Sequence, residues 1–167
     1  MKTLRTLAFA AAVLLLTSIS IEPDERDLTA YTPVLMKKSD LPASVFMQPP
    51  QDFRFPGKIY IYGNYIFIVD LFRGIHVIDN QDPANPHSTG FLHIPGVMDL
   101  AIREQVLYAD NSIDLVSIDI SGYPQINILD RLAGIFPEPT PPDLDFIPWA
   151  YSSHKRPANT VIVGWKK

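Results

Sequence analysis

The sequence contains no cysteine among its 167 residues. This absence excludes disulfide bonds, cysteine-containing metal sites and thiol catalysis. Charge is also sparse, since only 19% of the residues are Asp, Glu, Lys or Arg, while 47% are hydrophobic. That composition is typical of a globular chain rather than a disordered one.

Sequence signatures of catalysis and cofactor binding are missing. The chain has no GxSxG or HExxH motif, and neither GxGxxG nor GxxxxGK is present. These patterns mark nucleophile elbows, zinc sites and phosphate-binding loops. We therefore predict that the protein is not an enzyme, that it needs no cofactor, and that it has no catalytic, cofactor-binding or metal-ligating residues.

Clusters of basic residues are absent as well. The formal net charge is −4, and removal of residues 1–20 with Lys2 and Arg5 leaves 12 Lys and Arg against 18 acids, or −6. Binding to phosphate groups needs clustered Lys and Arg, so nucleic acid is not expected as a partner. The pairs Lys37-Lys38, Lys155-Arg156 and Lys166-Lys167 are interpreted as solvated loop charge.

The N-terminus has the three regions of a secretory signal peptide. Met1–Thr6 is basic, Leu7–Leu16 is an apolar run of ten residues, and Ser18 and Ser20 suit cleavage after Ser20. An uncleaved anchor is the alternative, although the apolar segment is short for a membrane span of about 20 residues. We expect an exported protein that is periplasmic, at the outer surface or secreted, with membrane contact only through an uncleaved signal. Position 19 is isoleucine, so a lipid cannot be attached through a cysteine there.

A repeat of about forty residues organises the rest of the chain. The first copy follows Pro56 and contains four short runs of β-branched and aromatic residues, which favour strands: Lys58–Tyr62, Tyr65–Val69, Ile75–Asp79 and His87–Ile94. Turn residues separate them at Gly63-Asn64, Asp70–Gly74 and Asn80–Pro86. The continuous apolar run Tyr65–Val69 predicts a central strand that is buried on both faces.

The second copy begins at Pro95-Gly96 and repeats this order. Its expected strands are Val97–Ile102, Val106–Asp110, Leu115–Asp119 and a fourth that starts at Ile126–Leu129. Four strands per unit and a period near forty are typical of a β-propeller. We therefore predict an all-β fold, a partial β-propeller of about two four-stranded blades with irregular proline-rich loops.

The runs GNYIFIVD, GIHVIDNQDPANP and VLYADNSIDLVSIDIS resemble the LVIVD-repeat propellers of bacterial surface and secreted proteins. The resemblance covers roughly the chain from Thr29 onward, and the repeats themselves cover about Pro56–Leu129. It implies a propeller fold with more copies than two, so that the chain is expected to be an N-terminal fragment. It implies no particular chemistry.

The repeats divide the chain into four parts. Residues 1–20 are the signal peptide, 21–55 a spacer and pre-blade segment, 56–131 the two repeats, and 132–167 a proline-rich loop and the start of a further blade. By analogy with propellers, Val34–Met36 or Val45–Met47 could supply a strand that closes a ring. Ala133–Trp149 holds five prolines, which predicts an extended surface loop, and Thr160–Trp165 returns to β character.

The polar residues that could form a binding site are four recurring aspartates and four histidines. Asp70, Asp79, Asp110 and Asp119 stand at equivalent strand ends. They either form a ring of acids around a channel that binds a cation or sugar, or they bond the backbone amides of the following turns, which we favour because it explains every copy at once.

The histidines have no zinc-site spacing, and we expect solvent-facing or hydrogen-bonded side chains. They are His76, His87, His93 and His154.

The aromatic residues of the first copy are expected to form core between the blades rather than a sugar platform; they are Phe53, Phe55, Tyr60, Tyr62, Tyr65, Phe67 and Phe72. Trp149 and Tyr151 lie in a proline-framed loop and are better candidates for a binding surface.

The binding residues stay unknown at this stage. We expect an exported, non-catalytic binding or interaction module at the cell envelope, with an unknown protein or glycan partner. The alternative is a fragment of a propeller-type hydrolase or lyase that acts on surface glycans. Blades with open faces also predict self-association of residues 21–167 made alone.

Overall fold

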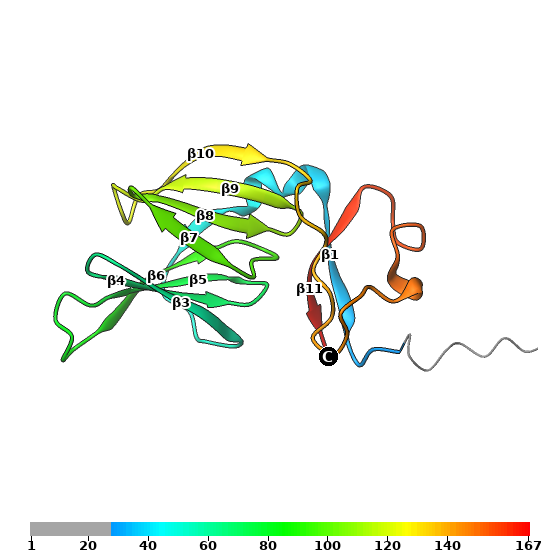
Figure 1. The fold of residues 1–167 in the computed structure, drawn as a ribbon, viewed down its shortest axis with the longest axis horizontal. Coiled ribbons are helices and arrows are strands. Elements are labelled where there is room, and N and C mark those ends of the chain that lie inside the picture. The colour runs from blue at the N-terminus through cyan, green and yellow to red at the C-terminus, as the bar shows by residue number, and fades with distance from the viewer. Residues whose placement is uncertain (1–27) are drawn as a thin grey trace, which may run out of the picture.

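The computed structural model describes residues 28–167. The expected signal peptide and the first residues of the spacer lie outside this range. Within it, strands and three short 3-10 helices form three antiparallel sheets (Figure 1). The all-β prediction is confirmed.

The first sheet contains the first repeat. Its strands in chain order are β2 (Phe46–Gln48), β3 (Pro56–Tyr62), β4 (Tyr65–Asp70), β5 (Gly74–Asp79) and β6 (His87–His93). They are arranged in the order β2-β6-β5-β4-β3, so the repeat forms a meander and β2 is added at its far edge. The four-strand prediction is therefore wrong by one strand here, because the pre-blade segment hydrogen-bonds to β6.

The second sheet contains the second repeat. Its strands are β7 (Leu100–Arg103), β8 (Val106–Asn111), β9 (Asp114–Asp119) and β10 (Asn127–Leu132), in the order β10-β9-β8-β7. The predicted strand Val97–Ile102 is thus too long at its start. Gly96 has a φ of 85° and Met98 and Asp99 donate their N–H groups to Asp110, which prevents these residues from joining the ladder.

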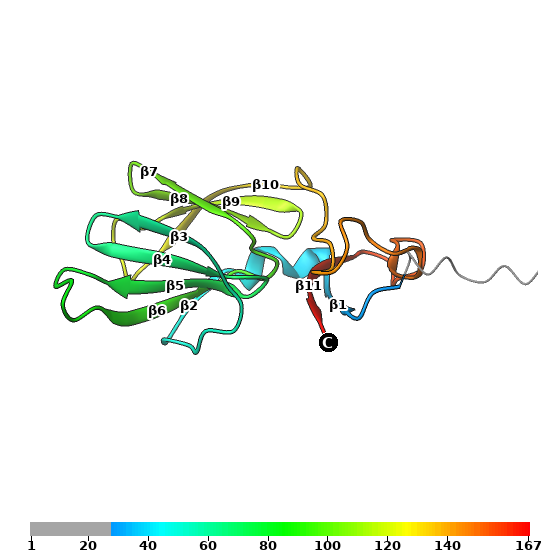
Figure 2. The ribbon, with the colours of Figure 1, turned by 60° about the horizontal axis from the view of Figure 1, so that its bottom comes forward.

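One hydrophobic core joins the two sheets, which lie one above the other (Figure 2). Strand residues alternate between faces, so Phe67, Val69, Ile75 and Val77 of the first sheet point to the same side. Together with their counterparts they form a core of fully or almost fully buried side chains: Val45, Phe67, Val69, Ile75, Val77, Leu92, Ile94, Val97, Leu100, Ile102, Leu107, Ala109, Val116, Ile118 and Ile120.

Tyrosine hydroxyls add polar contacts across this interface. Tyr60 donates its hydroxyl to the Ile102 carbonyl at 3.0 Å, and the Tyr62 hydroxyl accepts the Gln105 N–H at 3.0 Å. The amphipathic ring lets tyrosine bury apolar area while its hydroxyl reaches a partner. These two contacts hold the second sheet in a defined position against β3.

The outer face of the first sheet is more open than the sequence predicts. Ile66 and Ile68 of β4 are half-buried, while Phe67 and Val69 on the opposite face are buried. The expectation that Tyr65–Val69 is buried on both faces is therefore only half correct. Residues of the same row on β3 are mostly exposed, Ile59 by 61% and Ile61 by 67%.

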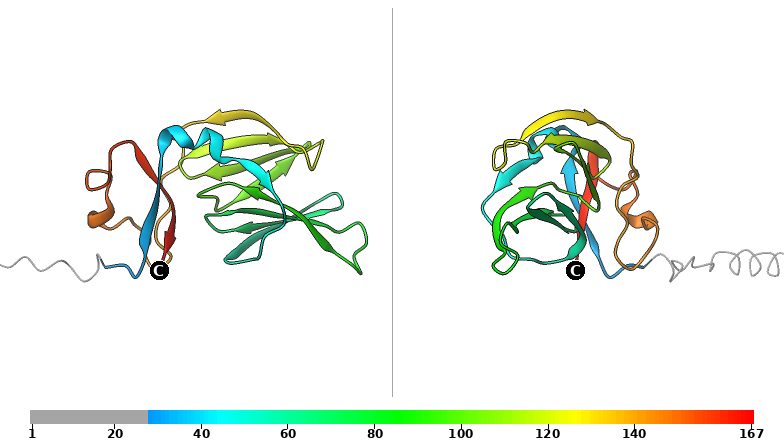
Figure 3. Two further views of the ribbon diagram at one scale, coloured as in Figure 1. Left: turned by 180° about the vertical axis from the view of Figure 1, so that it is seen from behind. Right: turned by 60° about the vertical axis from the view of Figure 1, so that its left-hand side comes forward.

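The third sheet is a pair of strands from the two ends of the described chain. β1 (Thr32–Lys37) pairs with β11 (Thr160–Lys166), and the pair stands beside the other sheets (Figure 3). The 3-10 turns η2 (Lys38–Asp40) and η3 (Pro42–Ser44) carry the chain from β1 to β2. Both segments named as possible extra strands thus do pair with β-structure, but they join two different sheets.

The proline-rich segment forms neither strand nor helix from residue 133 to residue 148, as predicted. It leads into η4 (Trp149–Tyr151) and then into β11. Part-buried ion pairing holds it in place, because Arg156 bonds both carboxylate oxygens of Glu138 at 3.0 and 2.6 Å. Glu138 also accepts the Ile162 N–H at 3.0 Å, which ties the loop to β11.

No helix in residues 28–167 has the length and apolar character needed to cross a membrane.

Candidate functional site

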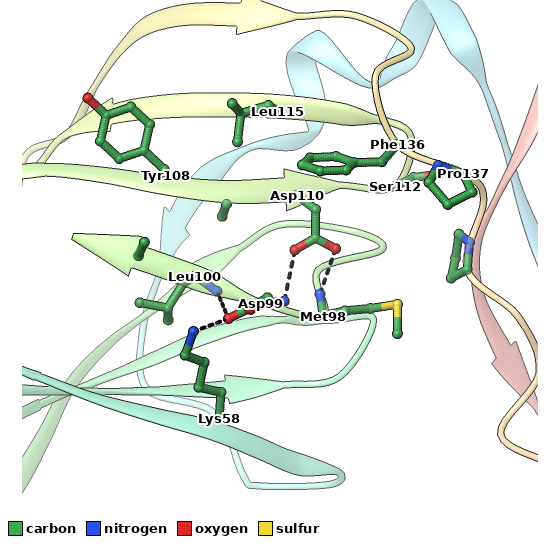
Figure 4. A pocket seen from close by; sticks show the side chains of 13 residues that line it. Lys58, Met98, Asp99, Leu100, Tyr108, Asp110, Ser112, Leu115, Phe136 and Pro137 are labelled. Carbon is green, nitrogen blue, oxygen red and sulfur yellow. Dashed lines mark hydrogen bonds and ion pairs between the residues drawn. The ribbon is translucent and has the colours of Figure 1, made fainter. Parts of the chain in front are cut away.

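A hollow of about 400 Å³ opens on the second sheet (Figure 4). Tyr108 and Leu115 line it from β8 and β9, whose alternate residues Leu107 and Val116 point into the core. The hollow therefore lies mainly on the outer face of this sheet. Phe136, from the proline-rich loop, covers one end of it.

Backbone and side-chain bonds hold the loop wall of the hollow. The Phe136 N–H donates to the Ile113 carbonyl at 3.0 Å, and the Gly134 N–H donates to Asp114 at 2.9 Å. Further along, the Trp165 indole N–H donates to the Pro139 carbonyl at 2.9 Å. The wall is thus built before any ligand arrives, which lowers the entropic cost of binding.

Two carboxylates and one amine border the opposite side. Asp110 accepts the N–H groups of Met98 and Asp99, both at 2.8 Å, and Asp99 pairs with Lys58 at 2.6 Å (Figure 4). Burial raises the pKa of the Asp110 carboxyl above its usual value, and the nearby charge of Asp99 adds to this effect, although the two N–H bonds oppose it.

Ser112, Lys58 and Asp110 of the hollow already have bonding partners within the protein. The Ser112 hydroxyl donates to the Ile162 carbonyl at 2.7 Å, the Lys58 amine is paired with Asp99, and Asp110 is bonded to two amides. A nucleophile needs a base within hydrogen-bond reach, and these contacts provide no such pair. The hollow has the chemistry of a mostly apolar binding surface bordered by two carboxylates and one amine.

A buried polar cluster occupies the equivalent place in the first sheet. Asp70 and His76 are fully buried, and the His76 Nε2–H donates to Asp70 at 3.2 Å. Arg73 pairs with the same carboxylate oxygen, and Phe53 stacks on the His76 ring with 3.9 Å between centroids. The Nδ1 atom of His76 has no partner among the described residues.

Hydrogen bonds decide the ionisation of Asp70. Burial on its own raises the pKa of this carboxyl, but it accepts the N–H groups of Phe55 at 2.7 Å and Arg54 at 3.2 Å. These bonds, with His76 and the charge of Arg73, hold the pKa below its usual value. The carboxylate at the centre of the cluster is therefore ionised and hydrogen-bonded through both oxygens. Its bonds to Arg54 and Phe55 hold the loop before β3 against the sheet.

The recurring aspartates all bond backbone amides. Asp79 accepts the Gln81 N–H and Asp119 accepts the Ser121 N–H, both at 2.8 Å, so the prediction for these two turns is confirmed. Asp70 and Asp110 also bond amides, but those of the segment that precedes the sheet rather than the turn that follows. The prediction is wrong on that point, because each of these two carboxylates faces the loop that leads into the first strand of its repeat.

The histidines do not converge. His76 and His93 are hydrogen-bonded, the latter donating from Nδ1 to the Ser44 carbonyl at 2.8 Å, and His87 and His154 are exposed. This agrees with the expectation of bonded or solvent-facing side chains. Among residues 28–167, no group of three or more His, Cys, Asp or Glu side chains is placed to hold a metal ion.

The aromatic residues divide into core and surface. Phe67, Tyr60, Tyr62 and Tyr65 pack in or against the shared core, as expected. Phe53 and Phe55 are exposed by 47% and 61%, so the prediction is wrong for these two, which lie in the loop before β3.

The two aromatic residues expected in a binding surface behave differently from each other. Trp149 is 66% exposed, with the Lys155 amine 4.0 Å above its ring centre. Tyr151 packs edge-on against Trp165, with 5.8 Å between centroids. Neither residue lines the hollow on the second sheet.

The sequence interpretation missed a second polar cluster. Arg131 of β10 donates to Asn111 at 2.8 Å, to Asp114 at 3.0 Å and to the Leu41 carbonyl at 3.3 Å. The available signal was a departure from the repeat, because Asp114 takes the position that Gly74 has in the first copy. The cluster links the second sheet to the segment between β1 and β2.

Comparison with family models, curated proteins and solved structures gave no match.

Proposed function

We propose that the chain is an exported, non-catalytic β-propeller repeat protein of the LVIVD type, which acts as a binding or interaction module at the cell envelope. The observation that carries the binding role is the preformed hollow on the outer face of the second sheet, in which Ser112 and Lys58 are already paired within the protein. A site that lacks a free nucleophile–base pair but offers apolar walls is suited to hold a partner rather than to transform it.

The relation between the two sheets supports the propeller architecture. Each contains a four-stranded antiparallel meander in chain order, and the second packs face to face on the first through one core. Asp70 and Asp110, which stand forty positions apart (110 − 70), bond incoming amides in the same way. Repeat units that bury one face against a neighbour are typical of propellers and other repeat folds.

The chemistry of the hollow favours a protein partner over a glycan. Tyr108, Leu115, Phe136 and Met98 present apolar surface, and the half-buried Asp110 already accepts two backbone N–H groups. A sugar would need several polar groups around it, because each of its buried hydroxyls must find a hydrogen-bond partner. An apolar side chain of a partner protein fills this space without that cost.

Site-specific photo-crosslinking tests the binding role. A benzophenone amino acid is placed at Tyr108, inside the hollow, and at Leu129, which is 56% exposed on β10 and does not line the hollow. Irradiation of cells that export the full chain should give a discrete protein adduct from position 108 and none from position 129. The adduct should be lost when Leu115 is replaced by Arg, which fills the hollow with charge.

Two results would overturn the proposal. Equal adducts from positions 108 and 129 would show that the hollow has no preferred partner. Release of reducing sugars from envelope glycans by the purified protein would favour the hydrolase or lyase alternative. The export part is tested separately, since N-terminal sequencing of periplasmic or secreted protein should begin at Ile21 or within a few residues of it.

A further inference from the structure

A second hollow, of about 540 Å³, lies between the first sheet and the β1–β11 pair. Its lining includes Phe91 of β6, together with Arg54 from the loop before β3 and Phe72 and Arg73 from the turn between β4 and β5. Trp165 and Lys166 of β11 line the other side. It shares no lining residue with the hollow on the second sheet. The two sites can therefore be changed independently.

The charge around this hollow is of one sign. Arg54, Arg73 and Lys166 line it, and its lining includes no Asp or Glu, although the chain as a whole has a net charge of −4. Asp70 lies beneath Arg73, fully buried, and offsets the charge of that residue. Among residues 28–167 neither Arg54 nor Lys166 forms an ion pair, so two cationic side chains remain for a ligand.

The walls of the hollow are aromatic and held in place. Phe72 has a φ of 66°, its N–H donates to the Val97 carbonyl at 2.8 Å, and its carbonyl accepts the Gly96 N–H at 3.0 Å. A Cβ atom at Gly164 would lie 2.9 Å from that of Phe72, so β11 packs closely on this residue. Trp165 follows Gly164 on β11, and its side chain lies on the other face of this strand, where its indole N–H donates to the Pro139 carbonyl and its ring packs against Tyr151.

Arg73 is also oriented before any ligand binds. Its guanidinium bonds Asp70 and, at 3.2 Å, the Asp52 carbonyl, both through Nη1, and it lies 5.5 Å from the centre of the Phe91 ring. A planar guanidinium held in this way is suited to bind a carboxylate with its remaining donors. The side chain keeps 27% exposure, so these donors are within reach of the hollow.

We propose that this hollow binds a small organic anion in which a carboxylate is carried on a ring. The carboxylate is recognised by Arg54, Arg73 and Lys166, and the ring lies against the aromatic walls. Acidic sugars of the hexuronate class and aromatic carboxylates share this chemistry. The volume of the hollow is within the range of small-molecule sites and accommodates a ring of either kind.

Tryptophan fluorescence provides a direct test. The chain has two tryptophans, and in a Trp149→Phe background only Trp165 reports, which belongs to the β11 segment that lines the hollow. The exported full chain is titrated with D-glucuronate, benzoate and glucose. We expect a saturable change with at least one of the two anions and none with neutral glucose, and the preferred anion identifies the source of the carboxylate.

Charge variants then assign the contact. Arg54→Gln/Lys166→Gln should weaken binding of that anion about tenfold, since each charge-assisted hydrogen bond is among the stronger polar contacts. The control Arg103→Gln/Lys155→Gln removes the same charge from exposed residues outside the hollow and should leave binding unchanged. All four side chains are at the surface, and a melting curve of each variant checks that the fold is retained.

No saturable change with either anion overturns the proposal, as does equal binding of glucose or an equal loss in the control variant. Crosslinking at Tyr108 does not depend on Arg54 or Lys166. A negative anion titration therefore does not contradict the proposed interaction role, and a negative crosslinking result does not contradict the anion site.

Discussion

Asp70 and Asp110 hold equivalent positions in the two repeats, and each receives two backbone N–H groups from the segment that leads into its own sheet. Their surroundings nevertheless shift their ionisation in opposite directions. Asp70 has Arg73 and His76 beside it, whereas Asp110 is opposite Leu115 in the ladder and the charge near it is that of Asp99, another acid. The pKa of Asp70 is lowered and that of Asp110 is raised.

We expect Asp70→Asn and Asp110→Asn to change the pH dependence of stability with opposite signs. The pKa of Asp70 is lower in the folded state than in the unfolded state, so the stability from its ionised form is present above the unfolded pKa of about 3.8 and is lost as pH falls through the folded pKa. The difference in unfolding free energy between the wild type and Asp70→Asn should therefore shrink below pH 4.

For Asp110 the folded pKa lies above the unfolded one, so the favourable contribution of the protonated form is complete below about pH 3.8 and is lost as pH rises through the folded pKa. The wild type should gain stability relative to Asp110→Asn as the solution is acidified. Urea unfolding between pH 6 and pH 3 measures both differences. Parallel curves for the two variants would contradict the opposite environments.

Gly96 should be intolerant of a side chain. Its φ is 85°, and a Cβ atom would lie 2.7 Å from the Ser112 nitrogen, which belongs to the backbone and cannot move aside cheaply. We expect Gly96→Ala to lower the free energy of unfolding by more than about 1 kcal/mol, because the native conformation is incompatible with alanine.

Gly122→Ala is the matched control for this change. The nearest atom to its Cβ would be the Gln125 carbonyl oxygen at 3.6 Å, an ordinary contact. Chemical denaturation of both variants should show a loss only at position 96. An equal loss at both positions would mean that close packing of Gly96 against Ser112 is not the cause.

The bidentate pair of Glu138 and Arg156 should stabilise the proline-rich loop. The Arg156 side chain is only 4% exposed, so Glu138→Gln leaves the positive charge of Arg156 buried without a carboxylate partner. The same substitution weakens the hydrogen bond from the Ile162 N–H to residue 138. We expect a loss of about 3 kcal/mol, as is usual when one partner of a buried pair is removed.

Glu104→Gln is the control for that prediction. Glu104 and Arg103 are exposed by 81% and 82%, and solvent screening makes such a pair worth less than about 1 kcal/mol. Thermal melting of the two variants compares a buried with an exposed ion pair. A small effect at Glu138 would show that the loop is held mainly by its other contacts.

The outer face of the first sheet should drive self-association. Ile59 and Ile61 are opposite Ile68 and Ile66 in the ladder and therefore share one face with them, which leaves a continuous apolar row on the side away from the core. We expect residues 21–167 made alone to associate, and Ile59→Thr/Ile61→Thr to reduce the associated fraction.

Light scattering after size-exclusion chromatography measures this association. Ile128→Thr/Ile135→Thr removes two other exposed isoleucines, 43% and 50% exposed, that do not belong to this face. The control should associate as the wild type does. A monomeric wild type with a cooperative melt would show that the open face is tolerated in solution.

The sequence by itself determined the strands and their order within each repeat. For seven of the eight repeat strands, the bounds predicted from runs of β-branched residues agree closely with the observed bounds. The agreement is good because strand propensity and turn residues such as Gly63-Asn64 act over a few residues. The one clear error, at Val97–Asp99, arose because the carboxylate of Asp110 binds two amides there, and that contact depends on a side chain eleven or more residues away.

The tertiary structure alone decided where the polar groups meet and which faces stay open. Nothing in the local pattern places Arg156 against Glu138 or joins β1 to β11, since these pairs are distant in the chain and form only when the whole fold brings them together. The two hollows have the same origin: each is bounded by segments from separate parts of the sequence, so its chemistry is fixed by packing and not by any motif.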